Sequence, residues 1–319
     1  MKILVAGCAG FIGSHLSERL LAENHEIIGL DNFSPFYDRK IKERNLSYLI
    51  NHDRFTFYEL DILNKEQLFE KIPKDIELIV NLASRAGVRP SIEQEEIYLD
   101  VNIKGNLNLL QLSKVCNCKK YFFASSSSIY GNNISGQPSK ESENSDKPIS
   151  PYAFTKRAAE LMNYYYHELY NIDIINARFF TVYGPRQRPD LAIHKFIKLL
   201  ENDQAIEIYG DGKTSRDYTY IDDIVDGIIK SIAYLKDNQK VYETVNLGNS
   251  KPLRLDDLVN TIAMGLKLKP KINYRDFQEG DVNHTNADIS HARKILGYDP
   301  RTDIKAGILK FISWYKSFN

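Results

Sequence analysis

The first fourteen residues constrain the fold of this chain more than any other segment. A short apolar run, Lys2–Ala6, leads into three glycines at three-residue spacing and then into the helical pattern SHLSERLLAE. This order predicts a buried parallel strand, a tight turn and a helix whose amino terminus can bind the pyrophosphate of a dinucleotide. Gly7 allows a sharp turn, Gly10 allows the backbone to approach phosphate, and Gly13 allows close packing of helix on strand.

A second apolar run, Glu26–Leu30, is followed directly by Asp31. An acidic residue about 20 residues beyond such a glycine loop can accept hydrogen bonds from the ribose diol of a bound adenosine. Its negative charge would repel the additional phosphate of NADP. The sequence therefore predicts NAD as the cofactor.

Short β-branched runs alternate with longer amphipathic segments over the first 180 residues. This alternation predicts an α/β fold with a doubly wound parallel sheet, a Rossmann fold. We expect helices over Asn106–Val115 and Tyr152–Leu169. The predicted strands are Lys2–Ala6, Glu26–Leu30, Phe55–Tyr58, Leu78–Leu82, Lys120–Ala124 and Asp173–Arg178.

The alternation of short apolar runs and longer amphipathic segments becomes less regular after residue 180. We expect residues 1–180 to form the NAD-binding domain and residues 181–319 to form mainly a smaller substrate-binding lobe. This lobe is predicted to return to the large sheet near residues 220–250, through Tyr242–Leu247. The segments RFFTVYGPRQRPD and IYGDGKTSRDYTY are predicted to form turns and a polar loop, and Ile134–Ile149 a surface loop beside the active site.

Composition excludes several kinds of partner. Lys and Arg total 42, as do Asp and Glu, so charge gives no reason to expect nucleic acid or an anionic membrane. No apolar run reaches the ~20 residues of a membrane span, and the apolar amino terminus is typical of a first strand rather than a signal peptide. The cysteines, Cys8, Cys116 and Cys118, indicate a reducing, cytoplasmic setting, and their spacing predicts no metal site.

Tyr152 and Lys156 are four residues apart in SPYAFTKRAAE, where Ser150 and Pro151 predict the start of a helix. The two side chains therefore share one helix face. Tyrosine is a poor base at neutral pH, since its ordinary pKa is about 10. A nearby ammonium and the positive nicotinamide ring of NAD would favour the phenolate and lower that pKa. With 20 tyrosines in the chain, the alternative is an ordinary pair on a half-buried helix.

The segment FFASSSSIYG, residues 122–131, is an apolar strand that ends in four serines. The carboxyl ends of parallel strands face the ligand crevice in sheets of this kind. A serine hydroxyl there could bond the substrate oxygen that Tyr152 deprotonates. A serine-rich turn without function is the alternative.

The glycine loop, Asp31, the serine run and the Tyr-x-x-x-Lys pair occur in this order within the first 156 residues. In this combination the sequence resembles the extended short-chain dehydrogenase/reductase family of nucleotide-sugar enzymes, almost from end to end. Among members it looks most like the UDP-glucuronate 4-epimerases, above all in LDNFSPFYD, AGVRPSIE and FFTVYGPRQRPD. Other matching stretches are VAGCAGFIGSHL, SSSSIYG, SPYAFTKRAAELM, GKTSRDYTYIDD and GDVNHTNADISHARKILGY.

The resemblance implies a role for each matching residue. Tyr152 would be the catalytic base, Lys156 its partner, and Ser126 the hydroxyl that shares the O4 proton. Lys156 can also hold the nicotinamide ribose. The implied cofactor-binding residues, besides Tyr152 and Lys156, are Gly7, Gly10, Phe11, Ile12, Gly13, Asp31, Asn32, Asp61, Ile62, Ala83 and Asn102.

The chain departs from the family pattern at four positions near the cofactor. Ala6 replaces the usual threonine before the glycine loop. Asn81, Ser84 and Arg85 replace the more common His, Ala, and Ala or Gln. We expect these changes to adjust NAD affinity without abolishing it.

The residues after Ser126 distinguish the reactions of the family. Related dehydratases carry an acidic pair there, and related decarboxylases usually carry a glutamate at the second position, whereas this chain has Ser127 and Ser128. Neither serine can act as acid or base at neutral pH. The resemblance therefore implies 4-epimerisation, in which the C4 hydride is taken, the 4-keto sugar rotates, and the hydride is returned to the other face.

The same serines bear on the substrate. With Thr181 they could bond a C6 carboxylate without adding a counter-charge, and holding that group in place would restrain decarboxylation of a β-keto acid. Other expected substrate-binding residues are Arg188, then Arg89, for the nucleotide or carboxylate, Arg216 for the diphosphate, and Asp281 for the uridine ribose. Arg186 and Arg188 could instead be merely solvated. Gln278 replaces a basic residue of hexose epimerases, which favours a different sugar.

The expected function is thus conversion of UDP-glucuronate to UDP-galacturonate, for a surface polysaccharide. Alternatives are a 4-epimerase of UDP-glucose or of an N-acetylated UDP-sugar and, in another class, a non-catalytic NAD-binding regulator. We also expect a homodimer, because Ile97–Val115 and Tyr152–Leu169 have apolar stripes and correspond to the family's intersubunit four-helix bundle. The alternative is that both stripes cover the sheet of their own subunit.

Overall fold

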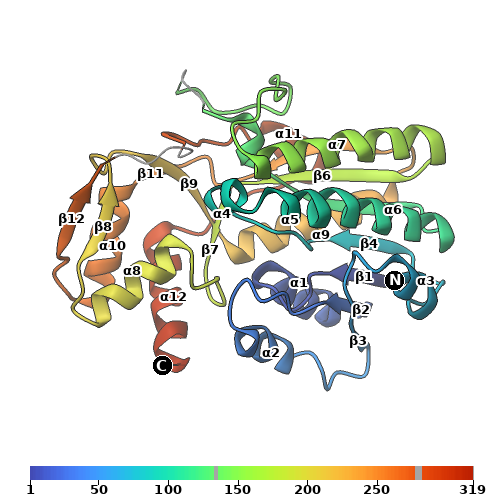
Figure 1. Ribbon diagram of the computed structural model, residues 1–319, viewed down its shortest axis with the longest axis horizontal. Helices are drawn as coiled ribbons and strands as arrows, with labels where there is room; N and C mark the ends of the chain where they lie inside the picture. The colour runs from blue at the N-terminus through green and yellow to red at the C-terminus, as the bar shows by residue number, and fades with distance from the viewer. Residues whose placement is uncertain (133–135, 277–281, 319) are drawn as a thin grey trace.

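The computed structural model describes residues 1–132, 136–276 and 282–318. Its centre is a seven-stranded parallel sheet with the strand order β10-β6-β5-β4-β1-β2-β3 (Figure 1). Helices lie on both faces, so the predicted doubly wound sheet is confirmed. The strands are β1 (Lys2–Ala6), β2 (Glu26–Asp31), β3 (Phe55–Glu59), β4 (Leu78–Asn81), β5 (Lys120–Ser126), β6 (Asp173–Phe179) and β10 (Tyr242–Leu247).

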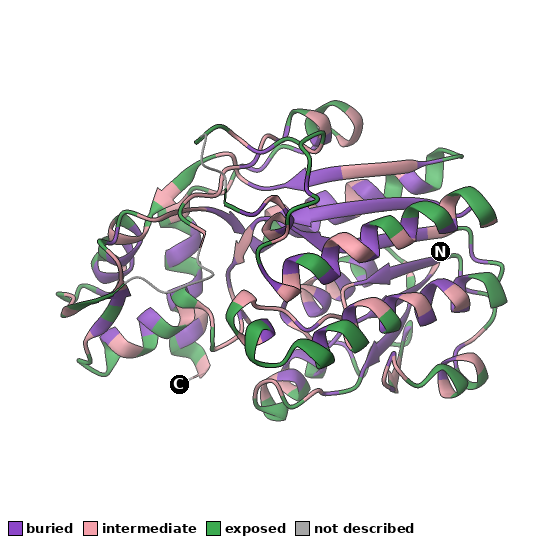
Figure 2. Ribbon diagram, turned by 45° about the horizontal axis from the view of Figure 1, so that its top comes forward, coloured by how far each residue is buried: buried purple, intermediate pink, exposed green. Residues whose placement is uncertain are grey.

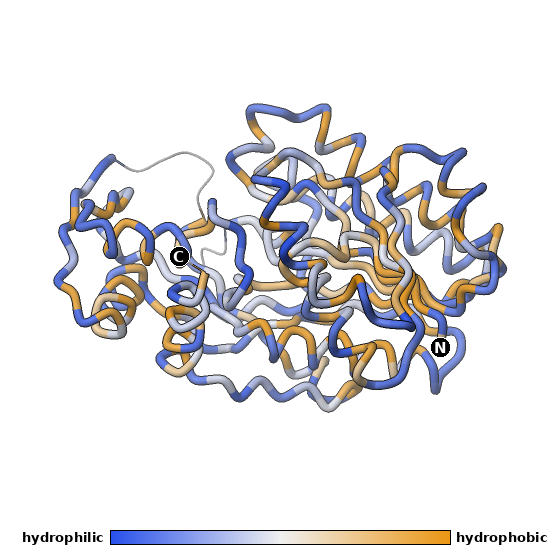
Figure 3. The backbone as a smooth tube through the Cα atoms, turned by 90° about the horizontal axis from the view of Figure 1, so that it is seen from below, coloured by the Kyte–Doolittle hydropathy of each residue, from blue (hydrophilic) through white to orange (hydrophobic). Residues whose placement is uncertain are grey.

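The central strands are buried on both faces, as Figure 2 shows in purple. Side chains alternate along β1: Ile3 and Val5 join the core with α1 (Phe11–Ala22) and α9 (Ile221–Asp237). Leu4 and Ala6 join the opposite core with α3 (Lys65–Lys71), α6 (Gly105–Val115) and α7 (Pro151–Tyr170). This two-sided burial explains the continuous apolar runs in the sequence. In Figure 3 the segments of hydrophobic residues, drawn in orange, are concentrated in the region of the sheet.

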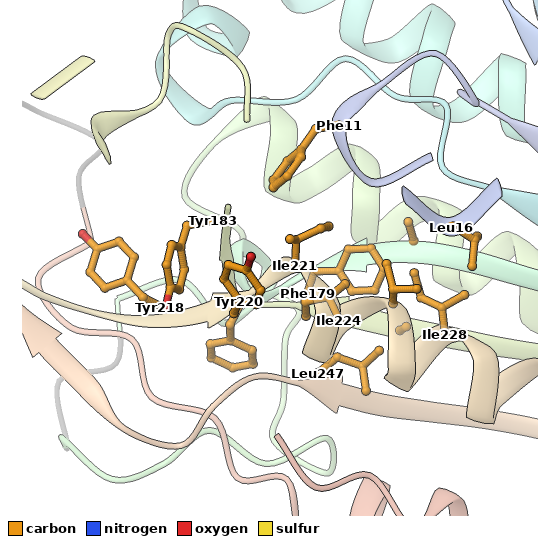
Figure 4. Close-up of a cluster of buried hydrophobic side chains, with 14 of the residues drawn as sticks. Phe11, Leu16, Phe179, Tyr183, Tyr218, Tyr220, Ile221, Ile224, Ile228 and Leu247 are labelled. Atoms are coloured by element: carbon orange, nitrogen blue, oxygen red, sulfur yellow. The ribbon is translucent and has the colours of Figure 1, made fainter. Parts of the chain in front are cut away.

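The core on the α1 side continues beyond the large sheet. Figure 4 shows Phe11 and Leu16 of α1 with Ile221, Ile224 and Ile228 of α9, and farther along Tyr183, Tyr218 and Tyr220. These tyrosines belong to the carboxyl-terminal half, so one apolar cluster joins the two halves of the chain. The two halves therefore pack against each other through a shared apolar core.

The second half of the chain contains two small sheets. One has the order β11-β9-β7 and the other pairs β12 with β8. The predictions of turns for RFFTVYGPRQRPD and a loop for IYGDGKTSRDYTY were therefore partly wrong, because they contain β7, β9 and part of β8. The strands are β7 (Thr181–Tyr183), β8 (Ile206–Tyr209), β9 (Ser215–Tyr220), β11 (Pro252–Arg254) and β12 (Ile272–Arg275).

Strand β10 lies at the edge of the large sheet, beside β6, which confirms the predicted return through Tyr242–Leu247. The division into domains near residue 180 stays a prediction. The remaining α-helices are α2 (Arg39–Ser47), α4 (Val88–Glu93), α5 (Glu95–Leu99), α8 (Ala192–Glu201), α10 (Leu255–Leu266), α11 (Ser290–Leu296) and α12 (Ile304–Phe318). In the described ranges, none of the helices combines the length and apolar character that crossing a membrane requires.

The predicted helix over Asn106–Val115 is the end of a longer helical run. Helix α5 continues through a π-helical segment, η1 (Asp100–Lys104), directly into α6. Such segments arise where an extra residue is accommodated in a helix, often at functional sites. The segment carries Asn102, which is buried beneath the strand ends described next.

Candidate active site

A cavity of about 510 Å³ opens at the carboxyl ends of the central strands. Its wall includes Gly7 after β1, Asp31 at the end of β2, Ala83 after β4 and Ser126 at the end of β5. In an open parallel sheet this edge is where ligands bind, at the point where the strand order reverses. Strands β1 and β4 meet there.

The glycine loop brings main-chain atoms close together on one side of the cavity. Gly7 has φ +85°, and a Cβ atom there would lie 2.9 Å from the main-chain nitrogen of Ala83. A Cβ atom on Gly13 would lie 2.1 Å from the carbonyl oxygen of Gly7. The predicted sharp turn and close helix packing are therefore confirmed. The amino terminus of α1 faces this loop, and Gly10 is its N-cap.

Asp31 lies at the end of β2, as the sequence predicts, and is buried. Its carboxylate accepts hydrogen bonds from the main-chain N–H groups of Phe33 (2.9 Å) and Ala9 (3.3 Å). It also pairs with the ammonium of Lys42 at 3.0 Å. Sequence analysis missed Lys42, because RKIKERN has the charge pattern of a solvated helix face.

The chain after β4 is held by Asn102. The side-chain oxygen of Asn102 accepts hydrogen bonds from the Arg85 N–H (2.8 Å) and the Ser84 hydroxyl (3.0 Å). Its amide donates to the Arg85 carbonyl and to the Thr155 hydroxyl, both at 3.0 Å. Asn102 does not itself line the cavity. It positions the segment that does, and its implied contact with the cofactor stays a prediction.

Tyr152 and Lys156 enter the cavity from the first turns of α7, where Pro151 is the first helical residue. Ser150 caps this helix, because its hydroxyl accepts a hydrogen bond from the N–H of Ala153 at 3.1 Å. The Lys156 ammonium donates to the Ala124 carbonyl of β5 at 2.7 Å. The predicted common face of the helix is confirmed.

Protonation of this pair is controlled by burial. Burial lowers the pKa of Lys156 to about 7, although the Glu160 carboxylate opposes that change. Burial also raises the pKa of the Tyr152 phenol, opposed by a hydrogen bond with Ser126 and by the charge of Arg188. The expectation that Lys156 brings the pKa of Tyr152 down is thus not met by these protein groups alone. The positive charge of oxidised NAD would act in the required direction.

A buried ionic network lies one turn beyond Lys156. The Glu160 carboxylate accepts two hydrogen bonds from Arg178 of β6, at 2.9 and 2.8 Å, and one from the Ser125 hydroxyl at 2.6 Å. Arg178 also donates to the Tyr130 hydroxyl at 3.0 Å. The network fixes α7 against β5 and β6, and therefore fixes the position of Tyr152 over the strand ends. The sequence carried no signal that would have revealed it.

The serine run begins in β5 and continues into a 3₁₀ turn, η2 (Ser127–Tyr130). Ser126, Ser127 and Ser128 all line the cavity. The Ser126 hydroxyl oxygen accepts a hydrogen bond from the Ser128 hydroxyl at 3.0 Å and from the Ser128 N–H at 3.2 Å. Neutral hydroxyl groups therefore gather beside Tyr152.

The other predicted substrate-binding residues divide into three groups. Thr181, Arg188 and Arg216 line the cavity, and the Arg188 guanidinium pairs with Asp190 at 2.7 Å. Arg89 does not line it, and its guanidinium lies over the ring of Tyr209, 5.2 Å from the centroid. Asp281 and Gln278 lie outside the described residues.

The predicted loop Ile134–Ile149 is described from Gly136 onward, where it contains no helix or strand. Its Glu141 accepts hydrogen bonds from the Asn246 N–H at 2.7 Å and, at its carbonyl, from Arg178 at 3.3 Å. This part of the loop contributes no residue to the cavity wall, and its expected place beside the active site stays a prediction. The wall also contains Phe36 and Tyr37, which sequence analysis did not single out.

Comparison with known proteins adds to this geometry. Residues 3–248 match the NAD dependent epimerase/dehydratase family. The chain belongs to this family. The predicted cofactor positions that line the cavity are Gly7, Gly10, Phe11, Ile12, Gly13, Asp31, Asn32, Asp61, Ile62, Ala83, Tyr152 and Lys156, so the cavity fits the NAD of the epimerase/dehydratase family.

Members of the epimerase/dehydratase family resemble the chain over nearly its whole length. It is 43% identical to a UDP-glucuronate 4-epimerase of Thermodesulfobacterium geofontis, over 98% of this chain and 95% of the relative. It is 40% identical to the protein CapI of Staphylococcus aureus, over 100% and 99%. The crystal structure of UDP-glucuronic acid 4-epimerase from Bacillus cereus, in complex with UDP-glucuronic acid and NAD, superposes with a TM-score of 0.94. The two chains are 34% identical and each is covered completely.

Proposed function

We propose that the protein is an NAD-dependent UDP-sugar 4-epimerase that interconverts UDP-glucuronate and UDP-galacturonate. The observation that carries this proposal is the cluster of three neutral hydroxyls, Ser126, Ser127 and Ser128, beside Tyr152. A dehydratase needs an acid and a base at the positions of Ser127 and Ser128. The relatives named UDP-glucuronate 4-epimerase support the same reaction.

The residues have separate roles in this proposal. Tyr152 removes the proton from the sugar O4 hydroxyl, and Ser126 shares that proton through its own hydroxyl. Bound NAD would supply the redox chemistry of the reaction, as acceptor and then donor of the C4 hydride. Lys156, when protonated, places a positive charge next to Tyr152, and it can hold the nicotinamide ribose. Because the 4-keto sugar can turn within the pocket, the hydride would return to the opposite face of C4 while Tyr152 returns the proton to O4.

The hydroxyl groups also suit the charge of the substrate. Ser127, Ser128 and Thr181 can donate hydrogen bonds to a C6 carboxylate, and none of them introduces a second negative charge. A carboxylate fixed by several such bonds is kept from the orientation in which a β-keto acid loses carbon dioxide. Arg188 and Arg216 line the same cavity and suit the diphosphate of a nucleotide sugar.

The direct test supplies purified protein and NAD with UDP-glucuronate, UDP-glucose or UDP-N-acetylglucosamine, and identifies each product by NMR. We expect UDP-galacturonate from the first substrate at a rate at least ~100-fold above the others, the size of discrimination that recognition of a charged group provides. Faster turnover of either neutral sugar would assign the enzyme to that substrate. Binding of NAD without turnover of any sugar would instead indicate a regulator.

We further propose that the protein is a homodimer. Apolar side chains of α7 are exposed, with Leu161 at 53% and Leu169 at 66% of full accessibility, and Ile97 and Leu99 of α5 are exposed nearby in the helical run. An isologous contact between two copies would cover these side chains. Light scattering should give a dimer mass at micromolar concentration, and L161E/L169E should give a monomer. A wild-type monomer would contradict the proposal.

A cytoplasmic location is part of the same proposal. Cys8, Cys116 and Cys118 are all unpaired and buried, which suits a protein that works among reduced thiols. A fluorescent fusion expressed in the native host should distribute through the cytoplasm. Accumulation outside the cell membrane would contradict this assignment.

A further inference from the structure

Arg85 brings an unusual charge into the cavity wall. Its side chain lines the cavity but the residue is only 9% exposed. One guanidinium nitrogen donates to the Ser34 hydroxyl at 3.2 Å and another to the Gln94 side-chain oxygen at 2.9 Å. The guanidinium lies over the ring of Phe36, 4.5 Å from its centroid. The remaining nitrogen, Nε, is buried without a hydrogen-bond partner.

All of these partners are neutral. Within the part of the chain that the structure describes, no carboxylate forms an ion pair with Arg85. Two other cations of the cavity wall differ, since Lys42 pairs with Asp31 and Arg188 pairs with Asp190. Burial lowers the pKa of the Arg85 guanidinium, and the charge of Arg188 acts in the same direction. A buried cation without a counter-charge is unfavourable, and an anionic ligand would remove the penalty.

The segment that carries Arg85 lies against the glycine loop. A Cβ atom on Gly7 would lie 2.9 Å from the nitrogen of Ala83 and 3.0 Å from the carbonyl carbon of Leu82. Asn102 fixes the main chain of Arg85 on both its N–H and its carbonyl. The main chain of Arg85 is therefore held in place next to the glycine turn, where a dinucleotide places its diphosphate.

The glycine loop itself offers no cation. Helix α1 begins with Phe11, Ile12 and Gly13, so its first turn provides only N–H groups and the helix dipole. We propose that Arg85 supplies the missing positive charge by binding the diphosphate of NAD, and that it thereby slows release of the cofactor. Retention matters for an epimerase, because the hydride must return to the same sugar before the cofactor leaves.

A UDP-sugar also carries a diphosphate, so the two sources of the anion need separate tests. Arg216 lines the cavity from the second half of the chain, whereas Arg85 follows β4, in the segment that contacts the glycine loop. Arg188 lies over the same Phe36 ring as Arg85, 4.9 Å from the centroid, but is already paired with Asp190. The proposal therefore assigns Arg85 to the diphosphate of the dinucleotide. It concerns cofactor binding in the absence of sugar and does not depend on which UDP-sugar is turned over.

The experiment compares the wild-type protein, freed of nucleotide, with R85Q and R85K. Gln is a common residue at this position in the family, and Lys keeps the charge without the fork of donors. Calorimetry measures the affinity for NAD, ADP-ribose, adenosine and UDP. For R85Q we expect ~10-fold weaker binding of NAD and ADP-ribose, with adenosine and UDP unchanged, and an intermediate loss for R85K. The dependence of NAD affinity on salt should also become shallower in R85Q.

The exposed Arg254, which pairs with Asp256 far along the chain, provides the matched control, so R254Q should bind NAD as the wild type does. Circular dichroism checks that R85Q is folded before the affinities are compared. Unchanged affinity of folded R85Q for NAD and ADP-ribose overturns the proposal. A loss confined to UDP also overturns it, by assigning Arg85 to the nucleotide sugar. An equal loss for adenosine would show that Arg85 acts only by shaping the loop.

Discussion

The two sides of the cavity are built from different parts of the chain. On the side of β1, main-chain atoms come so close that a Cβ on Gly7 or Gly13 would collide with backbone. On the side of β5 and α7, side chains provide the chemistry, with Ser126 and Ser128 joined by a hydrogen bond beside Tyr152. On the β1 side, adding a side chain to either glycine should therefore disrupt NAD binding as a whole. On the β5 and α7 side, replacing one side chain should affect only one property, either the rate of the reaction or the recognition of the substrate.

We expect the largest effect on the β1 side of the cavity from Gly13→Ala. The added Cβ would lie 2.1 Å from the Gly7 carbonyl oxygen and 2.9 Å from the Cys8 Cα, so α1 must move away from the turn. We expect NAD binding to weaken by ~1,000-fold or more, together with a lower melting temperature. Gly297→Ala is the control for NAD binding, because a Cβ placed on Gly297 would have no atom within 4 Å. Calorimetric titration that finds NAD binding intact in Gly13→Ala would refute the backbone argument.

Tyr152→Phe should affect only the chemistry. The variant keeps the ring and loses the hydroxyl that the mechanism uses as base. We expect kcat to fall by ~100-fold to ~10,000-fold while NAD affinity stays within a few-fold. Steady-state rates and a separate NAD titration measure the two quantities. Turnover near the wild-type rate would remove Tyr152 from the mechanism.

Ser128→Glu tests whether the substrate side recognises charge. Two negative charges about 4 Å apart repel by ~4 kcal/mol at an effective dielectric constant of about 20. Rotation or protonation of the new side chain reduces this, and we expect UDP-glucuronate to lose ~100-fold more affinity than UDP-glucose. Ser128→Gln has a similar size without the charge and is the control. Equal losses for both sugars in Ser128→Glu would show that the pocket responds to size alone.

The smallest effect concerns the stability of the protein without ligand. Folded Lys156 loses its proton near pH 7, whereas the unfolded chain keeps it to about pH 10.5. Between these values the unfolded state binds more protons, so wild-type stability rises with pH. Lys156→Met removes this penalty of about 4–5 kcal/mol near pH 7 but leaves the Ala124 carbonyl without its donor, so the net gain in stability should be about 2 kcal/mol. Chemical denaturation should find that the gain is steady below pH 7 and shrinks toward pH 10.5.

Lys198 is exposed on α8, so Lys198→Met is the matched control and should change stability little at any pH. A gain from Lys156→Met that grows with pH would contradict the depressed pKa of Lys156. The two variants together separate the effect of burying an ammonium from the general effect of replacing lysine by methionine.

The large sheet was predictable because its strands are buried on both faces and read as apolar runs. All seven predicted strands occur, including Tyr242–Leu247 at the edge. The small strands were missed for the opposite reason. Thr181–Tyr183 and Ser215–Tyr220 are short and rich in hydroxyl groups, and they pair only because α9 and the tyrosine core bring them together. No local pattern encodes that pairing.

The candidate site divides in the same way. The glycine loop, Asp31 and the Tyr152–Lys156 pair follow spacing rules and are predictable from the sequence. The partners Lys42 and Arg178 are not, because each reaches its carboxylate from a different helix or strand. Asn102 was assigned to the cofactor, whereas it bonds the main chain of Arg85. The spacing of residues in the sequence therefore identifies the side chains expected to react, but not the residues that position them by hydrogen bonds and ion pairs.

Because of the π-helical segment Asp100–Lys104, the number of residues between α5 and α6 constrains the geometry of the site. Each residue of an α-helix turns the chain by about 100°, so deleting one residue here would rotate Asn102 away from Arg85 or shift every residue before it. Most single substitutions at the exposed positions of this segment keep the count and leave that contact in place. Insertions and deletions between Leu99 and Gly105 should therefore be tolerated far less than substitutions. During evolution, substitutions should accumulate at the exposed positions of this helical run, whereas its number of residues should stay constant.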